Sequence, residues 1–269
     1  MIADVYDAFL FDLDGVLYRG TEPVPHAAAS VERLRSLGKG VAFVTNNSAR
    51  TPAQVAERLH LVGVEAHADE VETSALTTAG VLAGRGVRRA FVIGGAGIRE
   101  ALGTAGVDVV DGEPTEADAV VVGWDRDADY TSLRVASVLV QRGTPLVATN
   151  ADASFPAADG TKWPGAGALL AAIETTTGVR GEVVGKPHPP LLRAALDRAG
   201  GGRPLLVGDR LDTDIAGAAG LGWDSMLVLT GISSAAEATA SAARPTFIAD
   251  DLRALFHDDA GPVTGSGHG

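Results

Sequence analysis

Two aspartates follow the first apolar stretch of the chain, in the sequence AFLFDLDGVLYRG at residues 8–20. Asp12 and Asp14 are two positions apart, and on a β-strand such residues share one face of the sheet. At an effective dielectric constant near 20, two unit charges roughly 6 Å apart repel each other by about 3 kcal/mol. We therefore expect a cation, a shared proton or abundant water between these carboxylates.

Three further apolar stretches also run directly into polar residues. Thr45 and Asn46 follow VAFV, Lys186 follows EVVG, and Asp209 and Asp214 follow LLVG. In open α/β sheets, ligands bind outside the carboxyl ends of the strands. If these strands share one sheet, the polar groups converge at one edge.

The chemistry of these groups points to phosphoryl transfer. The carboxylates of Asp12, Asp14 and Asp209 are hard oxygen ligands of the kind that suits Mg²⁺. The hydroxyl, amide and ammonium groups after the second and third stretches are hydrogen-bond donors suited to phosphoryl oxygens. A cation, a phosphate cradle and a carboxylate nucleophile together favour phosphoryl transfer.

The elements that must position these residues alternate between short β-rich runs and Ala/Leu-rich helical stretches. This pattern predicts a mainly parallel α/β sheet. Helices are predicted over 25–38 and 189–200, each ending at a glycine. The predicted strands span residues 5–11, 41–44, 90–93, 119–122, 145–148, 182–184, 205–207 and 226–229.

The middle of the chain differs from its two ends. Residues 83–183 contain strand and helix patterns of their own but no second carboxylate cluster at a strand end. We therefore expect an inserted domain over 83–183, between the two halves of a core at 1–82 and 184–257. The polar, glycine-rich residues 258–269 are expected to form a flexible tail.

Composition excludes several classes of protein. The net charge of −12 and the pI near 4.9 argue against nucleic acid or an anionic membrane surface as a partner. The absence of cysteine excludes disulfides and thiolate nucleophiles. The N-terminus carries acids and no basic segment, unlike a signal peptide, and no apolar run reaches membrane-spanning length, so a cytoplasmic protein is expected.

The four motifs together resemble the haloacid dehalogenase-like (HAD) superfamily of phosphatases. They are DxDGxL at 12–17, TNN at 45–47, GKP at 185–187 and GDRLDTD at 208–214. The TNN motif and the large insert after it are similar to subfamily IIA, the NagD-type phosphatases. This resemblance implies a Rossmann-like, doubly wound parallel-sheet core with an inserted α/β cap domain.

The resemblance also implies a role for each motif residue. Asp12 would be the nucleophile that forms an aspartyl-phosphate, and Asp14 the general acid and base. Mg²⁺ would be held by the Asp12 carboxylate, the Asp14 backbone carbonyl and Asp209. Thr45, Asn46 and Lys186 would bind the phosphoryl oxygens. Asp214 would interact with the metal indirectly, through a water molecule or through a residue that binds the metal.

A cap of this kind implies small, soluble phosphomonoester substrates. Glycerol 3-phosphate is expected first, while phosphoglycolate, pyridoxal phosphate, nucleotides and sugar phosphates stay open. Within the cap, Asn150 and Asp152 are expected either to hydrogen-bond the leaving alcohol or to form an Asx-type turn. Family members often dimerise through the cap, so a homodimer is one expectation.

Other interpretations of the same residues stay open. Thr45 and Asn46 are residue types that also cap helix N-termini. The segment VIGGAGIREAL at 92–102 resembles a dinucleotide fingerprint but lacks its third glycine, so an ordinary strand-turn-helix unit is favoured. Asp212 is expected to be a solvated or capping acid. A different class of function is a non-catalytic, Mg²⁺-dependent binder of phosphorylated metabolites.

Overall fold

The computed structural model describes residues 1–156 and 161–257, which divide into two compact units. The first unit comprises Met1–Val44, Val55–Glu72 and the described residues from Lys186 on. The second comprises Thr45–Gln54 and the described residues of Thr73–Gly185. The predicted tail at 258–269 lies outside the described residues.

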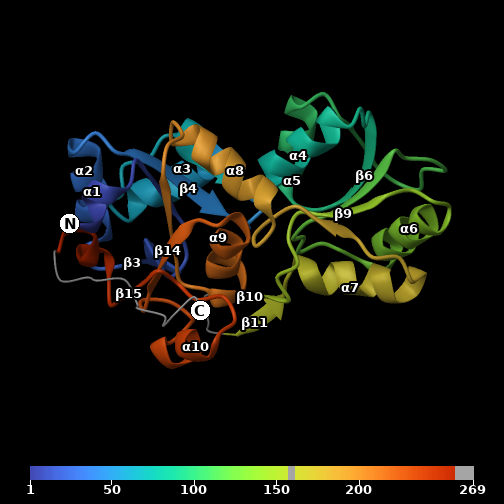
Figure 1. The fold of residues 1–269 in the computed structure, drawn as a ribbon. Coiled ribbons are helices and arrows are strands. Elements are labelled where there is room, and N and C mark those ends of the chain that lie inside the picture. The colour runs from blue at the N-terminus through green and yellow to red at the C-terminus, as the bar shows by residue number, and fades with distance from the viewer. Residues whose placement is uncertain (157–160, 258–269) are drawn as a thin grey trace. The chain divides into compact units, whose positions relative to one another are not determined.

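A six-stranded sheet forms the centre of the first unit (Figure 1). Its order is β15-β14-β13-β1-β4-β5, and β1 pairs in parallel with both β4 and β13. The strand bounds are β1 Ala8–Phe11, β4 Gly40–Thr45, β5 Val71–Thr73, β13 Pro204–Gly208, β14 Asp224–Val228 and β15 Phe247–Ala249. A short antiparallel pair, β2 Tyr18–Arg19 and β3 Glu22–Pro23, follows β1.

The central strand β1 is buried on both faces, which explains why its sequence is a continuous apolar run. Phe9 and Phe11 belong to one hydrophobic cluster, whereas Ala8 and Leu10 belong to another. Helices α2, α3 and η3 contribute to the first cluster, and α8 and α9 contribute to the second. The helix bounds in this unit are α1 Ile2–Val5, α2 Ala27–Ser36, α3 Pro52–Leu61, η1 Ala68–Glu70, α8 Pro189–Arg198, η2 Leu211–Ile215, α9 Ala216–Leu221, α10 Ala235–Ala240 and η3 Leu252–Phe256.

The second unit has a parallel sheet of its own, in the order β12-β9-β8-β6-β7. Its strands are β6 Arg89–Ile93, β7 Asp108–Val110, β8 Ala119–Val122, β9 Leu146–Ala148 and β12 Glu182–Val183. Helices α4 Ser74–Gly84 and α5 Ala96–Thr104 contribute to one cluster with this sheet, and α6 Tyr130–Gln141 and α7 Ala166–Thr177 to the other. The strands β10 Ser154–Pro156 and β11 Lys162–Pro164 form a separate antiparallel pair.

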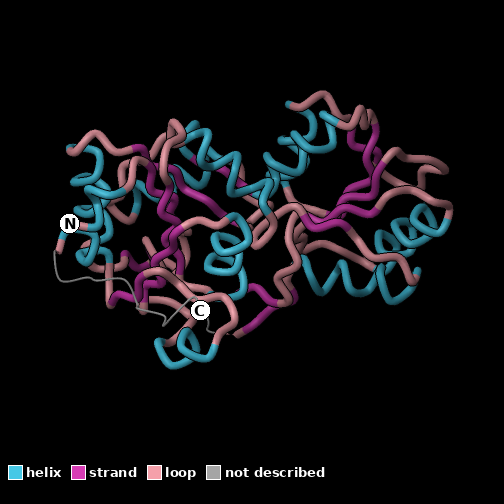
Figure 2. The backbone as a smooth tube through the Cα atoms, in the orientation of Figure 1, coloured by secondary structure: helices cyan, strands magenta, loops and turns pink. Residues whose placement is uncertain are grey.

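The parallel α/β class predicted from the strand and helix pattern is confirmed by the strand pairing. Figure 2 shows the strands and helices of both units. The first predicted strand was too long at its start, because Val5 lies in α1 and β1 begins at Ala8. Strands β2, β3, β5, β7, β10, β11 and β15 were not predicted.

The two units differ in their limits from the predicted core and insert. The second unit begins at Thr73 rather than at residue 83, and it also takes in Thr45–Gln54. The earlier start follows from α4, where Ala75, Ala79 and Leu82 pack in the same apolar cluster as β6 and α5. The roles of these units as catalytic core and cap stay a prediction.

Among the described residues, no helix combines the length and apolarity needed to cross a membrane. The predicted cytoplasmic location stays a prediction.

Candidate active site

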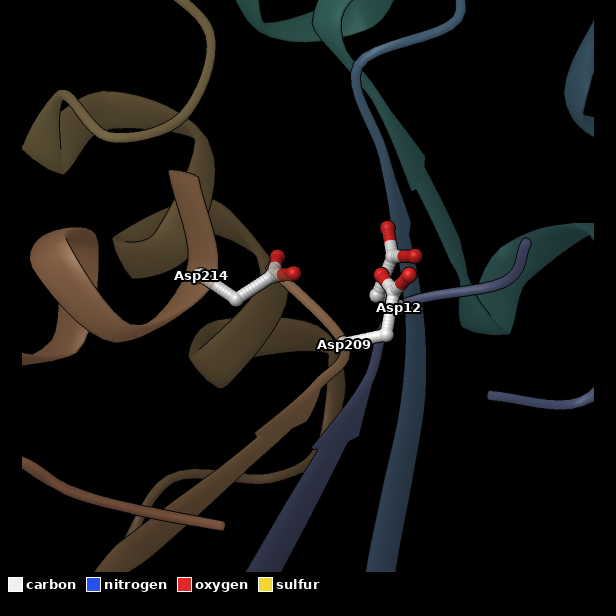
Figure 3. A group of neighbouring side chains, drawn as sticks. All are labelled: Asp12, Asp209 and Asp214. Atoms are coloured by element: carbon white, nitrogen blue, oxygen red, sulfur yellow. The ribbon is translucent and has the colours of Figure 1, made fainter. Parts of the chain in front are cut away.

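Three aspartates meet at the carboxyl end of the first unit's sheet. Asp12 follows β1 and Asp209 follows β13, and these two strands are paired up to Phe11 and Val207. Asp214 lies on the π-helical turn η2, which follows β13. One carboxylate oxygen from each aspartate lies within 4.8 Å of the others, and Figure 3 shows the three side chains converging. The predicted meeting of Asp12 and Asp209 therefore agrees with the structure.

Lys186 joins this group as a buried cation. Its Nζ lies 2.5 Å from Asp12 Oδ1 and 2.7 Å from Asp214 Oδ1, and its side chain is 2 % exposed. Asp12 and Asp214 therefore share the one ammonium. This contact between Lys186 and Asp214 was not predicted, because no local pattern indicates which carboxylate a distant lysine will meet.

Two glycines, Gly15 and Gly231, pack closely against the Asp209 carboxylate. Asp209 is 1 % exposed, and its Oδ2 accepts a hydrogen bond from Ile232 N at 2.8 Å. A Cβ atom on Gly231 or on Gly15 would overlap Oδ2, and Gly15 has a φ of +84°. Only glycine therefore lets both backbones approach this carboxylate.

The electrostatics of the group leave an excess of negative charge. Burial, together with Asp214 and Asp209, raises the pKa of Asp12 although Lys186 opposes this. Burial and Asp214 raise the pKa of Asp209 to about 6. Burial would lower the pKa of Lys186, but Asp12 and Asp214 outweigh burial and raise it. Three carboxylates thus face a single ammonium.

This charge and the donor set fit a hard divalent cation. Asp209 Oδ1 is buried and has no hydrogen-bond partner among the described residues, so the atom is suited to a metal. Asp12 is the least buried of the three aspartates and offers a second oxygen beside it. Carboxylate oxygens are the ligands that Mg²⁺ and Ca²⁺ prefer.

Asp14 is placed differently from the prediction. Strand β1 ends at Phe11, so the rule that put Asp12 and Asp14 on one strand face does not apply here. Asp14 is exposed, forms an isolated bridge with Tyr18, and is not among the three converging carboxylates. Its roles as general acid and base and as a metal ligand through its carbonyl stay predictions.

The remaining predicted residues belong to the second unit, where Asn46, Asn150 and Asp152 contact one another. Thr45 ends β4 and Asn46 follows it. Asn150 Nδ2 donates to Asn46 O at 2.7 Å, and Asn46 Nδ2 donates to Asp152 Oδ2 at 3.3 Å. Asp152 N donates to Asn150 Oδ1 at 3.0 Å, which is the Asx-type bond considered from the sequence. Substrate contact by Asn150 and Asp152 stays a prediction.

Two other motifs have structural explanations. Asp212 is exposed and pairs with Arg210 at 2.7 Å, as expected of a solvated acid. The segment at 92–102 is a strand-turn-helix unit that contains the end of β6 and most of α5. A Cβ on Gly97 would lie 2.6 Å from the carbonyl oxygens of Ser48 and Arg50. This glycine therefore permits close packing of α5 on the segment after β4.

Comparison with known protein families agrees with the fold. Residues 9–108 match the model of the haloacid dehalogenase-like hydrolase family, and residues 183–255 match the HAD-hydrolase-like model. The second match contains Lys186, Asp209 and Asp214, and the first contains the other motif residues before them.

Named relatives cover nearly all of the chain. The D-glycerol 3-phosphate phosphatase of Mycobacterium tuberculosis is 37% identical over 262 residues, which are 96% of this chain and 73% of that protein. The acid sugar phosphatase of Staphylococcus epidermidis is 36% identical over 249 residues, or 92% of this chain and 95% of the relative.

Solved structures agree with these relatives. The glycerol phosphate phosphatase of M. tuberculosis in complex with magnesium has a TM-score of 0.90 at 37% identity, covering 96% of this chain and 78% of the other. The same enzyme has also been solved in complex with calcium, with a TM-score of 0.89. NagD from Escherichia coli K-12 has a TM-score of 0.84 at 31% identity, over 91% and 96% of the two chains.

The match to the HAD-like hydrolase family and the relatives named as phosphatases make the chain a phosphoric monoester hydrolase, with the carboxylate cluster and the buried lysine at the carboxyl edge of its parallel α/β core. The chain belongs to the haloacid dehalogenase-like (HAD) superfamily and, within it, to subfamily IIA, the NagD-type phosphatases. The family and the core fold predicted from the four motifs are thereby confirmed.

Proposed function

We propose that the chain is a Mg²⁺-dependent phosphatase that hydrolyses small phosphomonoesters, glycerol 3-phosphate first, through an aspartyl-phosphate at Asp12. The observation that carries this proposal is the contact between Asp12 and the buried Lys186, 2.5 Å apart, at the carboxyl end of β1. The 37% identity to a D-glycerol 3-phosphate phosphatase supports the choice of substrate.

The Asp12 carboxylate is suited to nucleophilic attack. Lys186 binds Oδ1 and so holds the carboxylate in one orientation, while the side chain keeps 14% of its surface exposed for a substrate to reach. Attack forms a bond between an Asp12 oxygen and phosphorus and breaks the ester P–O bond. Hydrolysis of the resulting acyl phosphate releases inorganic phosphate and restores the carboxylate.

Asp14 is the candidate for both proton transfers. In the first step its carboxyl group gives a proton to the leaving alkoxide, and in the second its carboxylate takes a proton from the attacking water. The proton that Asp14 gives up in the first step is thus regained in the second, and the cycle ends with its carboxyl group restored.

A divalent cation would be held by the oxygens of Asp12 and Asp209 and by the carbonyl of Asp14. When bound, it supplies positive charge that offsets the charge on the phosphoryl oxygens. Lys186 adds to this, because Asp12 and Asp214 keep its ammonium protonated. We assign further phosphoryl contacts to Thr45 and Asn46.

We further propose that the second unit acts as a cap that limits substrate size, and that copies of the chain pair through it. Phosphoglycolate, pyridoxal phosphate, nucleotides and sugar phosphates are the alternative substrates. The acid sugar phosphatase relatives, 36% identical, favour the sugar phosphates among these.

Phosphate release from a panel of these esters tests the proposal. It should be measured with Mg²⁺ and with EDTA, in the wild type, Asp12→Asn and Asp212→Asn, whose exposed aspartate serves as the matched control. We expect release that requires the metal, persists in Asp212→Asn and is lost in Asp12→Asn. Equal turnover in Asp12→Asn would contradict the covalent mechanism, and binding of esters without release would favour the non-catalytic alternative.

A further inference from the structure

The backbone carbonyl of Asn46 is held by two buried side chains of the second unit. Ser74 Oγ and Asn150 Nδ2 each donate a hydrogen bond to Asn46 O, both at 2.7 Å. Ser74 is fully buried and Asn150 is 4 % exposed. A carbonyl oxygen has two acceptor sites, so these donors use both and leave this peptide group little freedom to rotate.

The peptide group between Asn46 and Asn47 also contacts the side chain of Thr45. The Asn46 carbonyl shares a planar peptide unit with Asn47 N–H. That N–H donates to Thr45 Oγ1 at 3.1 Å. A threonine hydroxyl that accepts there keeps its one proton for donation, for example to a phosphoryl oxygen. The direction of the Asn46 carbonyl and that of the Thr45 hydroxyl are therefore linked.

Neighbouring contacts hold this loop within the second unit. Ala49 N donates to Asn47 Oδ1 at 2.9 Å, and Gly97 N donates to Ala49 O at 2.9 Å. Asn150 is itself oriented, since its Oδ1 accepts from Asp152 N and its Nδ2 is thereby directed at Asn46. The amide of Asn150 thus has its acceptor and its donor both engaged by the protein.

We propose that Ser74 and Asn150 are positioning residues for phosphate binding: they hold the Asn46–Asn47 peptide and through it the Thr45 hydroxyl. This inference rests on the proposed role of Thr45 and Asn46 as phosphoryl ligands. It gives Asn150 a function toward the phosphoryl group, which every substrate shares, rather than toward the leaving alcohol.

Three variants remove the donors with little other change. Ser74→Ala deletes one hydroxyl, Asn150→Ser deletes the amide donor but keeps an oxygen for Asp152 N–H, and the double variant deletes both. Ser74→Thr restores a hydroxyl, and Ser137→Ala, which alters another buried serine of this unit, is the control.

The readouts are kcat/KM for several esters and the affinity for inorganic phosphate. We expect each single variant to lower kcat/KM roughly tenfold, by the same factor for glycerol 3-phosphate, phosphoglycolate and p-nitrophenyl phosphate. The dissociation constant of inorganic phosphate from the Mg²⁺-loaded protein should rise similarly, and Ser74→Thr should recover part of the loss. A loss that differs between esters while phosphate affinity stays constant would overturn the inference and assign Asn150 to the leaving alcohol. An equal loss in Ser137→Ala would also overturn it.

Direct phosphate titration separates this inference from the proposed function. If the wild type hydrolyses none of the esters, the phosphatase proposal fails, yet weaker phosphate binding in Ser74→Ala and Asn150→Ser would still support the positioning role. Unchanged phosphate binding in these variants, or none in the wild type, would overturn it.

Discussion

The Lys186 ammonium lies 2.5 Å from Asp12 Oδ1, although 174 positions separate the two residues in the chain. Both belong to the first unit, where Asp12 follows the central strand β1 and Lys186 precedes α8. Because Lys186 also contacts Asp214 at 2.7 Å, one ammonium compensates two carboxylates in a buried site. This sharing leads to the first prediction.

Lys186→Met should destabilise the protein strongly. The change leaves Asp12 and Asp214 buried without their cation, and breaking a buried ion pair from one side costs about 3 to 5 kcal/mol. Urea unfolding of Lys186→Met measures this, with Lys162→Met at an exposed position as the control. Adding Asp214→Asn should recover part of the lost stability. If Lys186→Met unfolded at the wild-type urea concentration, the ion-pair account would be wrong.

Stabilisation by a divalent cation should depend on pH. Burial raises the pKa of Asp209 to about 6, so the folded state binds this proton more tightly than the unfolded chain does. Ionising Asp209 therefore lowers stability progressively as pH rises from near 4 to 6, and the full cost applies above 6. A cation offsets this cost only where the carboxylate is ionised.

Thermal unfolding with Mg²⁺ and with EDTA, at pH 5 and pH 7.5, checks this dependence. At a cation concentration about a hundred times its dissociation constant, we expect ~2 to 3 kcal/mol of stabilisation at pH 7.5 and much less at pH 5. Asp209→Asn should abolish the difference between the two pH values. An equal shift of Tm at both pH values would contradict the prediction.

Gly231→Ala should weaken metal binding and lower stability. The added Cβ would overlap Asp209 Oδ2, so the carboxylate or the backbone must move. We expect a loss of about 1 to 3 kcal/mol, the usual cost of overpacking. The measurement is Tm with and without Mg²⁺, beside Gly80→Ala, where nothing lies within 4 Å of the new methyl group. Gly80→Ala should be neutral or stabilising, and equal behaviour of the two variants would refute the steric argument.

Asp224 should contribute stability at neutral pH that is lost in acid. Burial alone would raise its pKa, but hydrogen bonds from Arg203 at 2.8 Å and Thr246 at 2.9 Å outweigh burial and lower the pKa. The folded state therefore favours the carboxylate. The gain is complete above the unfolded-state pKa of about 3.9 and disappears as pH falls through the lowered value.

Asp224→Asn should accordingly cost about 1 kcal/mol at pH 7 and little at a pH below the lowered pKa. Thermal unfolding at several pH values follows the difference between variant and wild type, with the exposed Asp111→Asn as the control. A difference that does not change with pH would show that Asp224 acts through packing rather than through its charge.

Local patterns predicted those features that depend on neighbouring residues in the chain. Apolar runs that end on polar residues indicated β1, β4 and β13 and the edge where Asp12 and Asp209 meet. Parallel pairing aligns the carboxyl ends of neighbouring strands, so the first polar residues after β1 and β13 come together. The order of the four motifs added the family.

The tertiary structure alone decided the contacts that join distant segments. The ion pair between Lys186 and Asp214, the approach of Gly231 to Asp209 and the bond from Asn150 to the Asn46 carbonyl belong to this group. Which residues meet in these contacts depends on how the strands and turns pack and on the side-chain rotamers that the packing allows. The periodicity of the sequence does not encode this packing. The same reason explains why Asp14, two positions from Asp12, lies off the strand face predicted for it: the chain bends after Phe11 to bring Gly15 against Asp209.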